Sequence, residues 1–430
     1  MMTTNDRTEL QHNLRKTLAL GFCQVFLVIM PVLVPFFESR GLILKEIFFL
    51  QALFAGVVLL MEVPSGYLAD ILGRKRTILL GSIFLGCGHS LLLIAYDFQM
   101  LAAFEVLLGI GVSLISGSDL ALIYDTEAAL EERAERQQKV VRWLFTAHTS
   151  SEALASLVCS LLLLAWSMQA AVYVQVFVSW IPLVIACTLV EPPGERLSSD
   201  NHLANFGMIL KALLRDGAVL RFCFLSLCLW SLTTFYAVWL LQKIWQQQGI
   251  QLHLFGYLWG VLMLVSAVAG KYAQVVERKI GSPALLALAG LAPAVGYLGL
   301  STLGVLGGLL ASLTFFVARG FGLVVLREAL NSRVPGKFRA TANSLASFGF
   351  RGAFAVSGPV VGYALDLWGM QTTLLLLAGF SIALFAGLLL PLILAIRSSQ
   401  ARQSSEIGLA QVGLPETDAG LAVTKSMSRS

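Results

Sequence analysis

Seven ionisable residues interrupt long apolar stretches of this 430-residue sequence and are the first candidates for chemistry. They are Glu62, Glu105, Asp119, His148, Glu152, Arg319 and Arg351. A charge in apolar surroundings costs several kcal/mol, so such side chains usually face a cavity or an opposite charge. Acids and histidine can take up and release protons, whereas arginine keeps its charge and attracts anions. These residue types therefore predict proton binding and ion pairing within the apolar stretches.

Four of these residues are candidates for carrying a proton: Asp119, Glu152, Glu105 and His148. Glu152 and Asp119 rank ahead of Glu105, which lies nearer the end of its apolar stretch. His148 precedes Glu152 by one helical turn and would share its face, so the two residues could share a proton. The alternative for His148 is a hydrogen-bonded histidine of the core.

The sequence does not favour an enzyme. No nucleophile and base, and no His/Cys cluster with metal-ligand spacing, stand together, and no phosphate-binding glycine loop precedes a lysine. All six cysteines fall within apolar stretches, which predicts no disulfide framework. We therefore predict no enzyme activity, no cofactor and no metal site.

The elements that position these residues are membrane-spanning helices. Hydrophobic residues make up 57% of the chain and charged residues 13%, a balance that excludes an ordinary soluble protein. Stretches of roughly 20 apolar residues can cross a bilayer, and in lipid they must be helical. Twelve are predicted: 17–37, 47–69, 77–96, 99–125, 141–165, 170–190, 220–243, 252–276, 282–300, 303–328, 341–365 and 371–396. The predicted class is an all-α polytopic membrane protein.

The twelve helices are expected to form two six-helix bundles. The predicted parts are an N-terminal tail 1–16, a bundle 17–190, a linker 191–219 with an amphipathic segment near Phe206–Leu214, a bundle 220–396 and a disordered tail 397–430. A faint repeat supports the division, because residues 66–70 align with 270–274 and Asp125 aligns with Glu328 at nearly the same shift. Duplicated halves of this kind are common in transporters.

Orientation follows from the basic residues. Of the 30 Lys and Arg residues, only Arg40, Lys45 and Lys243 fall in the loops assigned to the outside. Basic residues concentrate on the cytoplasmic side, so both termini, the linker and the tails are predicted to be cytoplasmic. The net charge of +5 is explained by this asymmetry and does not indicate nucleic-acid binding. A bacterial inner membrane is the expected location.

A short motif between the second and third apolar stretches carries the strongest resemblance. It reads Gly66-Tyr67-Leu68-Ala69-Asp70-Ile71-Leu72-Gly73-Arg74-Lys75-Arg76. This run resembles the signature loop of the major facilitator superfamily. The resemblance implies a cytoplasmic gate in which Asp70 faces the start of the eleventh helix and Arg74 pairs with Asp125. Gly66 and Gly73 would allow a close approach and a tight turn.

The resemblance also implies which buried charges meet. Helices 1, 4, 7 and 10 line the central cavity of facilitator folds, so Asp119 and Arg319 are expected to face each other across it. Helices 2 and 11 adjoin, which favours a bridge between Glu62 and Arg351. The alternative is that each group of the first pair is satisfied within its own half.

The same fold implies a substrate cavity. Its candidate residues are Trp230, Thr234, Phe235 and Tyr236 on the seventh helix and Gln24 on the first. Aromatic and hydroxyl groups suit an amphiphilic or cationic organic ligand, although aromatic residues at this depth also serve packing. Pro31 and Pro35 predict that the first helix is bent.

The resemblance implies a monomeric secondary active transporter in the lipid bilayer. It would move a small organic solute by alternating access, and we expect proton-coupled export. Glu105 stands where the family usually has arginine, and the fifth helix lacks the Gly-Pro pair that is typical of proton-driven exporters. Uptake by proton symport therefore stays open, and a sensor that has lost transport is a remote alternative.

Overall fold

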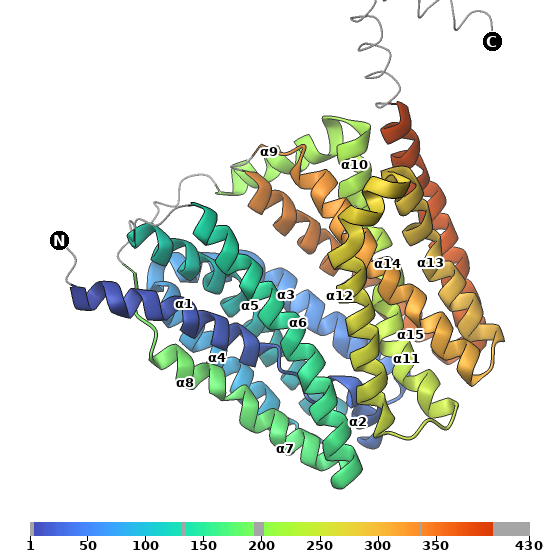
Figure 1. Cartoon of the computed structure of the whole chain (residues 1–430). Coiled ribbons are helices and arrows are strands. Elements are labelled where there is room, and N and C mark those ends of the chain that lie inside the picture. Colours follow the sequence, from blue (N-terminus) through green and yellow to red (C-terminus); the bar gives the residue numbers. More distant parts are fainter. Residues whose placement is uncertain (1–3, 131–133, 193–201, 336–337, 399–430) are drawn as a thin grey trace, which may run out of the picture.

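The computed structural model describes residues 4–130, 134–192, 202–335 and 338–398, and these residues form two helical bundles that lie side by side (Figure 1). The N-terminal half consists of α1 (Thr4–Gln24), η1 (Met30–Val32), α2 (Leu33–Ser39), α3 (Leu44–Leu72), α4 (Arg74–Leu91), α5 (Phe98–Ala129), α6 (Ala134–Ala165), α7 (Met168–Ser179) and α8 (Ile181–Cys187). The C-terminal half consists of α10 (Ala218–Leu225), η2 (Ser226–Trp230), α11 (Leu232–Gln247), α12 (Leu254–Ile280), α13 (Ser282–Thr302), α14 (Val305–Asn331), α15 (Arg339–Leu384) and η4 (Phe385–Leu389). The all-α class is confirmed.

The molecule has two distinct ends. The start of α1 and the linker helix α9 (His202–Arg215) lie at the terminal end, and α2 lies at the opposite, far end (Figure 1). Nine helical stretches of the described chain are long and apolar enough to cross a membrane. The first and third predicted spans are not among them, and the eleventh and twelfth are joined in one stretch, Thr341–Ser398. Within that stretch, Gly369 has a φ of +73° and divides two helical arms.

The predicted boundaries differ in detail from the observed helices. The segment 1–16, assigned as a tail, is helical from Thr4 onward and runs directly into the first span. The linker contains α9, and its residues Ile209 and Leu213 are buried in the apolar core of the C-terminal half. Residues 399–430 of the predicted disordered tail, and 193–201 of the linker, lie outside the described residues.

The first predicted span is broken in its middle. Helix α1 ends at Gln24, and regular structure resumes with the short turn η1 and with α2. Pro31 and Pro35 lie beyond the break, and proline has no backbone N–H to continue a helical ladder. Backbone groups near the break therefore need partners from other helices, because the hydrocarbon core of a bilayer offers no hydrogen bonds.

Two buried glutamines supply these partners. Gln175 of α7 accepts a hydrogen bond from the Ile29 N–H at 3.4 Å. Gln242 of α11 accepts from the Val34 N–H at 2.9 Å and donates to the Met30 carbonyl at 3.1 Å. Gln242 is completely buried and belongs to the other half of the molecule. The break in the first span is thus stabilised by both halves at once.

The two halves are joined by ion pairs at the far end. Lys243 of α11 contacts Glu38 of α2 at 2.6 Å, and Lys45 of α3 contacts Asp366 of α15 at 3.1 Å. Each pair links one half to the other and is partly exposed to solvent, so each contributes at most about 1 kcal/mol. The ion pairs therefore determine which surfaces of the two halves meet, and they contribute little to the free energy of folding.

Small residues allow the halves to pack closely next to these ion pairs. A side chain on Gly256 of α12 would collide with the Ser156 carbonyl of α6, and one on Gly362 of α15 would lie 3.1 Å from the Phe48 side chain of α3. The Tyr257 N–H donates to Ser160 Oγ of α6 at 2.9 Å. Helix contacts in membranes commonly rely on such small residues.

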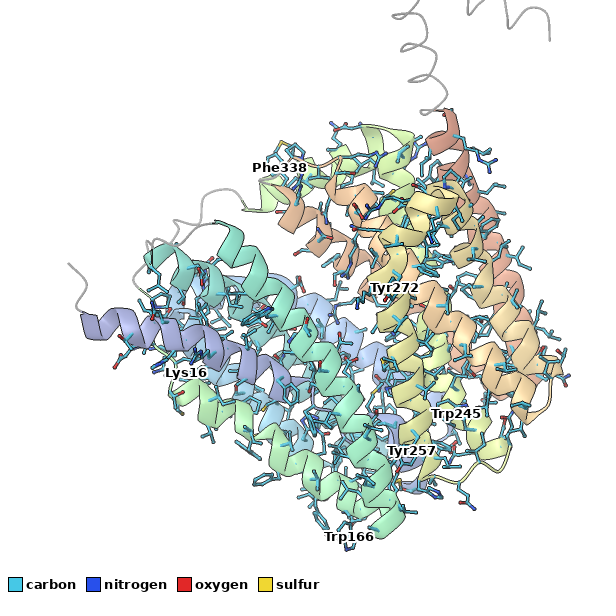
Figure 2. The ribbon with its side chains drawn as sticks, viewed as in Figure 1. Lys16, Trp166, Trp245, Tyr257, Tyr272 and Phe338 are labelled. Atoms are coloured by element: carbon cyan, nitrogen blue, oxygen red, sulfur yellow. The ribbon has the colours of Figure 1, made fainter. Side chains whose placement is uncertain are left out.

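Polar and aromatic side chains mark both ends of the bundle. Trp166 and Tyr257 lie toward the far end, and Lys16 and Phe338 lie toward the terminal end (Figure 2). Trp166 is largely exposed, and Lys16 donates to the Thr188 carbonyl at 2.5 Å. Tryptophan and tyrosine are enriched where a membrane meets water, and lysine is enriched on the cytoplasmic side.

The substitution Gln242→Ala tests the role of this residue in joining the halves. It should lower the free energy of unfolding by about 1–3 kcal/mol, because the Val34 N–H and the Met30 carbonyl lose a buried partner. Denaturation of the purified protein in detergent measures the change. Gln247→Ala, on an exposed position of the same helix, is the matched control. Equal stability of the two variants would contradict the assignment.

Candidate functional site

A cavity of about 440 Å³ lies between the two halves. Its walls come from the broken first span and from α6, α11, α12 and α14, and they are mostly apolar. The lining residues are Leu27, Met30, Thr149, Glu152, Phe235, Val238, Trp259, Met263, Ser266, Ala267, Gly270, Phe316, Arg319, Gly320, Leu323 and Val324. The volume falls in the range of roughly 300–1,000 Å³ that is typical of small-molecule sites. Glu152 and Arg319 are the ionisable members of this lining.

Helix periodicity explains how α6 and α12 form two of the walls. Thr149 and Glu152 are three residues apart on α6 and face the cavity, and Ser156 continues the same stripe into the close contact with α12. On α12, Trp259 and Met263 are spaced by four residues and lie on one face. The helices touch at the small residues and diverge toward the terminal end, which leaves the cavity between them.

Close packing of α14 against α12 brings Arg319 to the cavity. A side chain on Gly320 would lie 2.5 Å from the Ser266 carbonyl and 2.7 Å from the Ala269 side chain. With glycine there, the two backbones approach closely, and the neighbouring Arg319 lines the cavity. Arg319 lies near the middle of α14, and Glu152 lies near the middle of α6.

Glu152 and Arg319 share the cavity without forming a direct ion pair. Their charges act on each other across it, and Arg327, two turns further along α14, also acts on Arg319. In the described part of the chain, neither Glu152 nor Arg319 makes a hydrogen bond or a salt bridge to another side chain. Glu152 is exposed and Arg319 is half-buried, so both groups are accessible from the cavity.

Aromatic rings form the apolar part of the wall. Phe235 meets Phe354 edge to face, with ring centroids 4.7 Å apart, and Trp259 meets Phe316 in the same way at 6.1 Å. Such contacts hold the rings in place. The cavity therefore combines a rigid aromatic surface with one acidic and one basic group.

The predicted pairing of Asp119 with Arg319 is wrong for this structure. Asp119 is 4% exposed on α5, and its Oδ1 accepts from the neighbouring Leu120 N–H at 2.6 Å. Residue spacing along the chain did not determine the direction in which its side chain leaves the helix. The carboxylate points into the N-terminal half, and Glu152 is the acid that shares the cavity with Arg319.

Two other proton candidates also lie inside the N-terminal half. Glu105 is buried and accepts from Gln51 Nε2 of α3 at 2.6 Å. His148 packs against Gly21 of α1, so closely that a Cβ added at Gly21 would lie 2.8 Å from the His148 Nε2. This nitrogen is buried and has no hydrogen-bond partner in the described chain. His148 is therefore not hydrogen-bonded to Glu152 in this structure.

Glu62 and Arg351 lie on opposite halves, as the adjacency of helices 2 and 11 implies. Their charges act on each other, but no ion pair joins them within the described residues. The Arg351 Nε is buried and has no hydrogen-bond partner there. The two groups are neighbours across the interface and do not form the predicted direct bridge.

Of the five predicted cavity residues, Phe235 is the one that lines this cavity. Trp230 is buried in the C-terminal half, where its ring packs on Gly322 and its Nε1 donates to the Gly290 carbonyl at 3.4 Å. Thr234 bonds to its own helix at 3.1 Å. The Tyr236 hydroxyl donates to Ser357 Oγ at 2.6 Å.

Gln24 is half-buried at the end of α1 and is not among the lining residues. The contribution of α12 was not predicted from the sequence, whereas the first span was expected to line the cavity and does so through other residues than Gln24. Trp259 and Met263 carried no signal beyond helical spacing. Pro31 signalled the bend in the first span, and Leu27 and Met30 line the cavity beside it.

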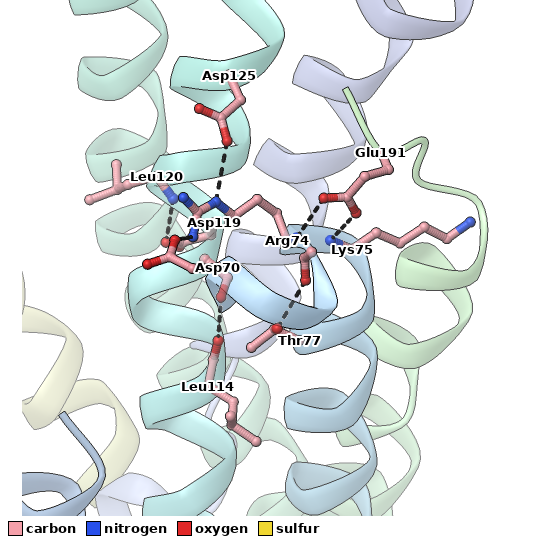
Figure 3. Close-up of polar contacts among 11 residues, drawn as sticks. Asp70, Arg74, Lys75, Thr77, Leu114, Asp119, Leu120, Asp125 and Glu191 are labelled. Carbon is pink, nitrogen blue, oxygen red and sulfur yellow. Dashed lines mark hydrogen bonds and ion pairs between the residues drawn. The ribbon is translucent and has the colours of Figure 1, made fainter. Parts of the chain in front are cut away.

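The loop 66–76 forms a network around Arg74 at the terminal end (Figure 3). The guanidinium contacts Asp70 at 2.8 Å and Asp125 of α5 at 3.2 Å. The contact between Arg74 and Asp125 is the one that the resemblance implies. Asp70 was expected to face the start of the eleventh helix, and in this structure it pairs with Arg74 instead. The halves meet at the far end, so the loop contacts its own half.

Glu191, which no sequence pattern connected with this loop, caps the start of α4. Its carboxylate accepts from the Arg74 N–H at 2.6 Å and from the Lys75 N–H at 2.8 Å (Figure 3). An acid is favoured there, because the first N–H groups of a helix have no partners within it and carry partial positive charge. Gly73 has a φ of +92°, and a side chain there would lie 2.7 Å from Glu191 Oε1. Glycine therefore serves both the turn and the cap.

Gly66 is exposed one helical turn before Asp70, and a side chain there would meet no atom within 4 Å. The close backbone approach expected at Gly66 is therefore not made in this structure. In the C-terminal half, Gln274 Nε2 donates to Glu328 Oε2 at 3.0 Å. These residues align with Asp70 and Asp125 in the internal repeat, so both halves link the corresponding helices at the terminal end.

No group of three metal-ligating side chains is found among the described residues, and their six cysteines are free. The described site thus consists of a charged, aromatic cavity between the halves and a polar loop at one end.

Known proteins share this architecture. A family model described as Major Facilitator Superfamily matches residues 17–332. A comparison with curated proteins gives no match. Among solved structures, a mutant of the nucleoside transporter NupG has a TM-score of 0.74 at 14% identity and covers 89% of this chain and 99% of its own.

Two further structures are similar over most of their length. A bacterial homolog of the human lysosomal transporter Spinster, inward-facing and unoccupied, has a TM-score of 0.70 at 15% identity, covering 92% of this chain and 98% of its own. A POT family transporter in complex with a thioalcohol-conjugated peptide has a TM-score of 0.67 at 13% identity, covering 90% and 96%. At these identities the likeness concerns the fold.

The substitution Glu191→Ala tests the cap on α4. Loss of the carboxylate should weaken the first turn by about 1 kcal/mol, which corresponds to roughly fivefold faster amide exchange at residues 74 and 75. Hydrogen–deuterium exchange with mass spectrometry measures this. Glu9→Ala, at an exposed position of α1, is the control, and unchanged exchange in the Glu191 variant would show that the cap is not needed.

Proposed function

The chain belongs to the major facilitator superfamily, and from that premise we propose that it moves a small organic solute across a membrane by alternating access, driven by protons. The observation that carries the proposal is the cavity between the halves, which holds Glu152 and Arg319 without partners from the described chain. Exposed charges at membrane depth need a ligand, a proton or water to compensate them. During a transport cycle, a substrate, a proton and water would occupy such a site one after another.

Alternating access is supported by the difference between the two ends. At the far end, Gln242 and two ion pairs hold the halves together. At the terminal end, the polar contacts of the loop 66–76 stay within the N-terminal half in the described chain. The basic residues favour a cytoplasmic terminal end, so we propose that this conformation faces inward. Location in a bacterial inner membrane and function as a monomer belong to the same proposal.

The loop 66–76 is proposed to close the inner side in the opposite conformation. Asp70 now pairs with Arg74, which is also held by Asp125. When the halves close at this end, the start of α15 approaches, and its unpaired N–H groups would attract the Asp70 carboxylate. Arg74 would then remain with Asp125 and keep the loop in position. The loop switches between two sets of partners without exposing an uncompensated charge.

The proposal has two versions, export in exchange for a proton and uptake by proton symport, which differ in the direction of transport. Export, the version expected from the sequence, moves substrate and proton in opposite directions. A specific observation favours the symport alternative: Arg319 lies in the same cavity as Glu152. A cationic substrate exchanged for a proton at Glu152 would be repelled by Arg319. An anion would instead be attracted there, and it would bind best when Glu152 carries a proton.

The gate is tested by Asp70→Asn and Arg74→Ala. Both should reduce flux at least about tenfold, because each breaks a charge-assisted contact of the loop, while insertion and folding are retained. Transport by purified protein in liposomes is the measurement, with size-exclusion profiles to check folding. Lys75→Ala is the control, since the Lys75 side chain has no ion pair within the described chain. Normal flux in both gate variants would refute the gate.

Proton coupling is tested with a pH-sensitive dye inside the same liposomes. A compound that is transported should move protons with it, and Glu152→Gln should abolish the proton movement because amides do not titrate. Asp119→Asn tests the buried acid of α5, which is not among the residues that line the cavity. Solute flux without proton movement in the unmodified protein would point to another coupling ion or to a uniporter. Binding without any flux would favour the sensor alternative.

A further inference from the structure

We propose that the cavity selects an organic monoanion with an aromatic or aliphatic body, whose anionic group binds Arg319 while Glu152 is protonated. The inference rests on the proposed transport function and names the substrate class of the same site. It joins three observations: an arginine and an acid that share the cavity and have no ion pair within the described residues, and a rigid apolar wall.

Arg319 is the group that would hold the anion. It lines the cavity, makes no salt bridge in the described chain and lies near the middle of α14. The guanidinium keeps its charge and presents several donors in a planar fork that matches a carboxylate. Arg327, two turns away, adds positive potential at Arg319. A second positive charge raises the attraction for an anion and disfavours a cation.

Glu152 competes with such an anion for Arg319. The two side chains share the cavity, and their charges already act on each other. An anionic substrate placed between them would meet the negative charge of Glu152 at short range. A proton on Glu152 removes this repulsion and leaves Arg319 free for the substrate. Substrate and proton therefore favour each other's binding, and the linkage is reciprocal.

The other ionisable groups around Glu152 do not offer the same coupling. His148, one turn earlier on α6, packs against Gly21, and Asp119 and Glu105 are buried within the N-terminal half. A zwitterion whose ammonium group bound Glu152 would hold this acid ionised. Among the described residues that line the cavity, Glu152 is the one acid, so none would then be available for the proton. The monoanion is the choice that lets Glu152 titrate.

The walls define the rest of the ligand. Phe235, Trp259 and Phe316 line the cavity together with Met30 and Met263. The phenylalanine and tryptophan rings are fixed by edge-to-face contacts, whereas methionine side chains adapt to the shape of a ligand. A cavity of about 440 Å³ admits a compact molecule with one ring or a short chain. Hydroxyl groups of a threonine and a serine add polar contacts to a lining that is otherwise mostly apolar.

The charges of the substrate and the proton then determine whether the two move in the same direction. A monoanion and one proton enter the cavity together and add no net charge to it. The pair can cross while the halves rock about it, and both are released on the other side. Transport of this kind is symport, so the proton gradient would drive the anion inward.

The test uses purified full-length protein and isothermal titration calorimetry with matched probes. Phenylacetate, phenethylamine, phenylacetamide and phenylalanine share one ring and differ in charge, and octanoate, octylamine and octanamide repeat the set with a chain. We expect a carboxylate to bind at least about tenfold more tightly than the amine, amide and zwitterion. Its affinity should rise up to about tenfold for each pH unit lowered across the titration range. Equal or stronger binding of the amines or amides, or no binding by either carboxylate, would overturn the proposal.

Variants separate the roles of the two charged groups. Glu152→Gln should retain carboxylate binding and remove its pH dependence, because glutamine mimics the protonated acid. Arg319→Gln should weaken binding about 10- to 100-fold, and Arg319→Lys should restore part of it. Glu9→Gln and Arg15→Gln, at exposed positions of α1, are the controls. Loss of binding in Glu152→Gln would instead indicate a zwitterion or cation and would refute the monoanion.

The binding test is independent of the transport test. If carboxylates bind as expected but no solute crosses the liposome membrane, the proposed function fails and the ligand class stands. If transport is found for an amine with Arg319→Gln unchanged, the ligand class fails and the transporter stands. Melting curves in detergent check that Arg319→Gln is folded.

Discussion

The structure depends on one constraint, which is that a polar group without a partner inside the membrane costs free energy. The broken first span is the clearest case, because it leaves backbone groups that its own helix does not satisfy. Gln242, from the opposite half, bonds to two of them and is completely buried. The same bonds join the halves at the far end. Separation of the halves at the far end would leave those backbone groups without hydrogen-bond partners. The same hydrogen bonds therefore complete the broken first span and hold the two halves together at this end.

The same constraint explains where the cavity lies. Next to the far-end contacts, α6 and α12 touch through Ser156 and Gly256, and beyond this point they diverge. Glu152 lies one turn past that contact, and Arg319 faces the same space from α14. Charges at this depth are tolerated because the cavity admits water, protons or a ligand. In the mechanism that we propose, these two charged groups are the ones that bind the substrate and the proton.

The loop 66–76 at the terminal end also supplies partners to its charged and N–H groups, but these partners come from its own half. Arg74 is held by two acids, and Glu191 satisfies the exposed N–H groups at the start of α4. Asp70, Asp125 and Glu191 thus each have a partner within the N-terminal half. If the loop is the gate that we propose, these contacts would keep it stable in the conformation that is open at this end. A new partner on α15 would change the pairing without leaving a charge alone.

The sequence by itself determined the helical class, the approximate extent of most spans and the signature loop. Hydropathy fixes length, and a helix advances by a constant rise for each residue, so these properties are local. Only the tertiary structure decided which neighbour each side chain faces around its helix axis. Asp119 and Glu152 were equal candidates in the sequence, yet one points into its own half and the other into the cavity. Trp230 and Phe235 separate in the same way. Packing between distant helices sets these directions, and no local pattern records it.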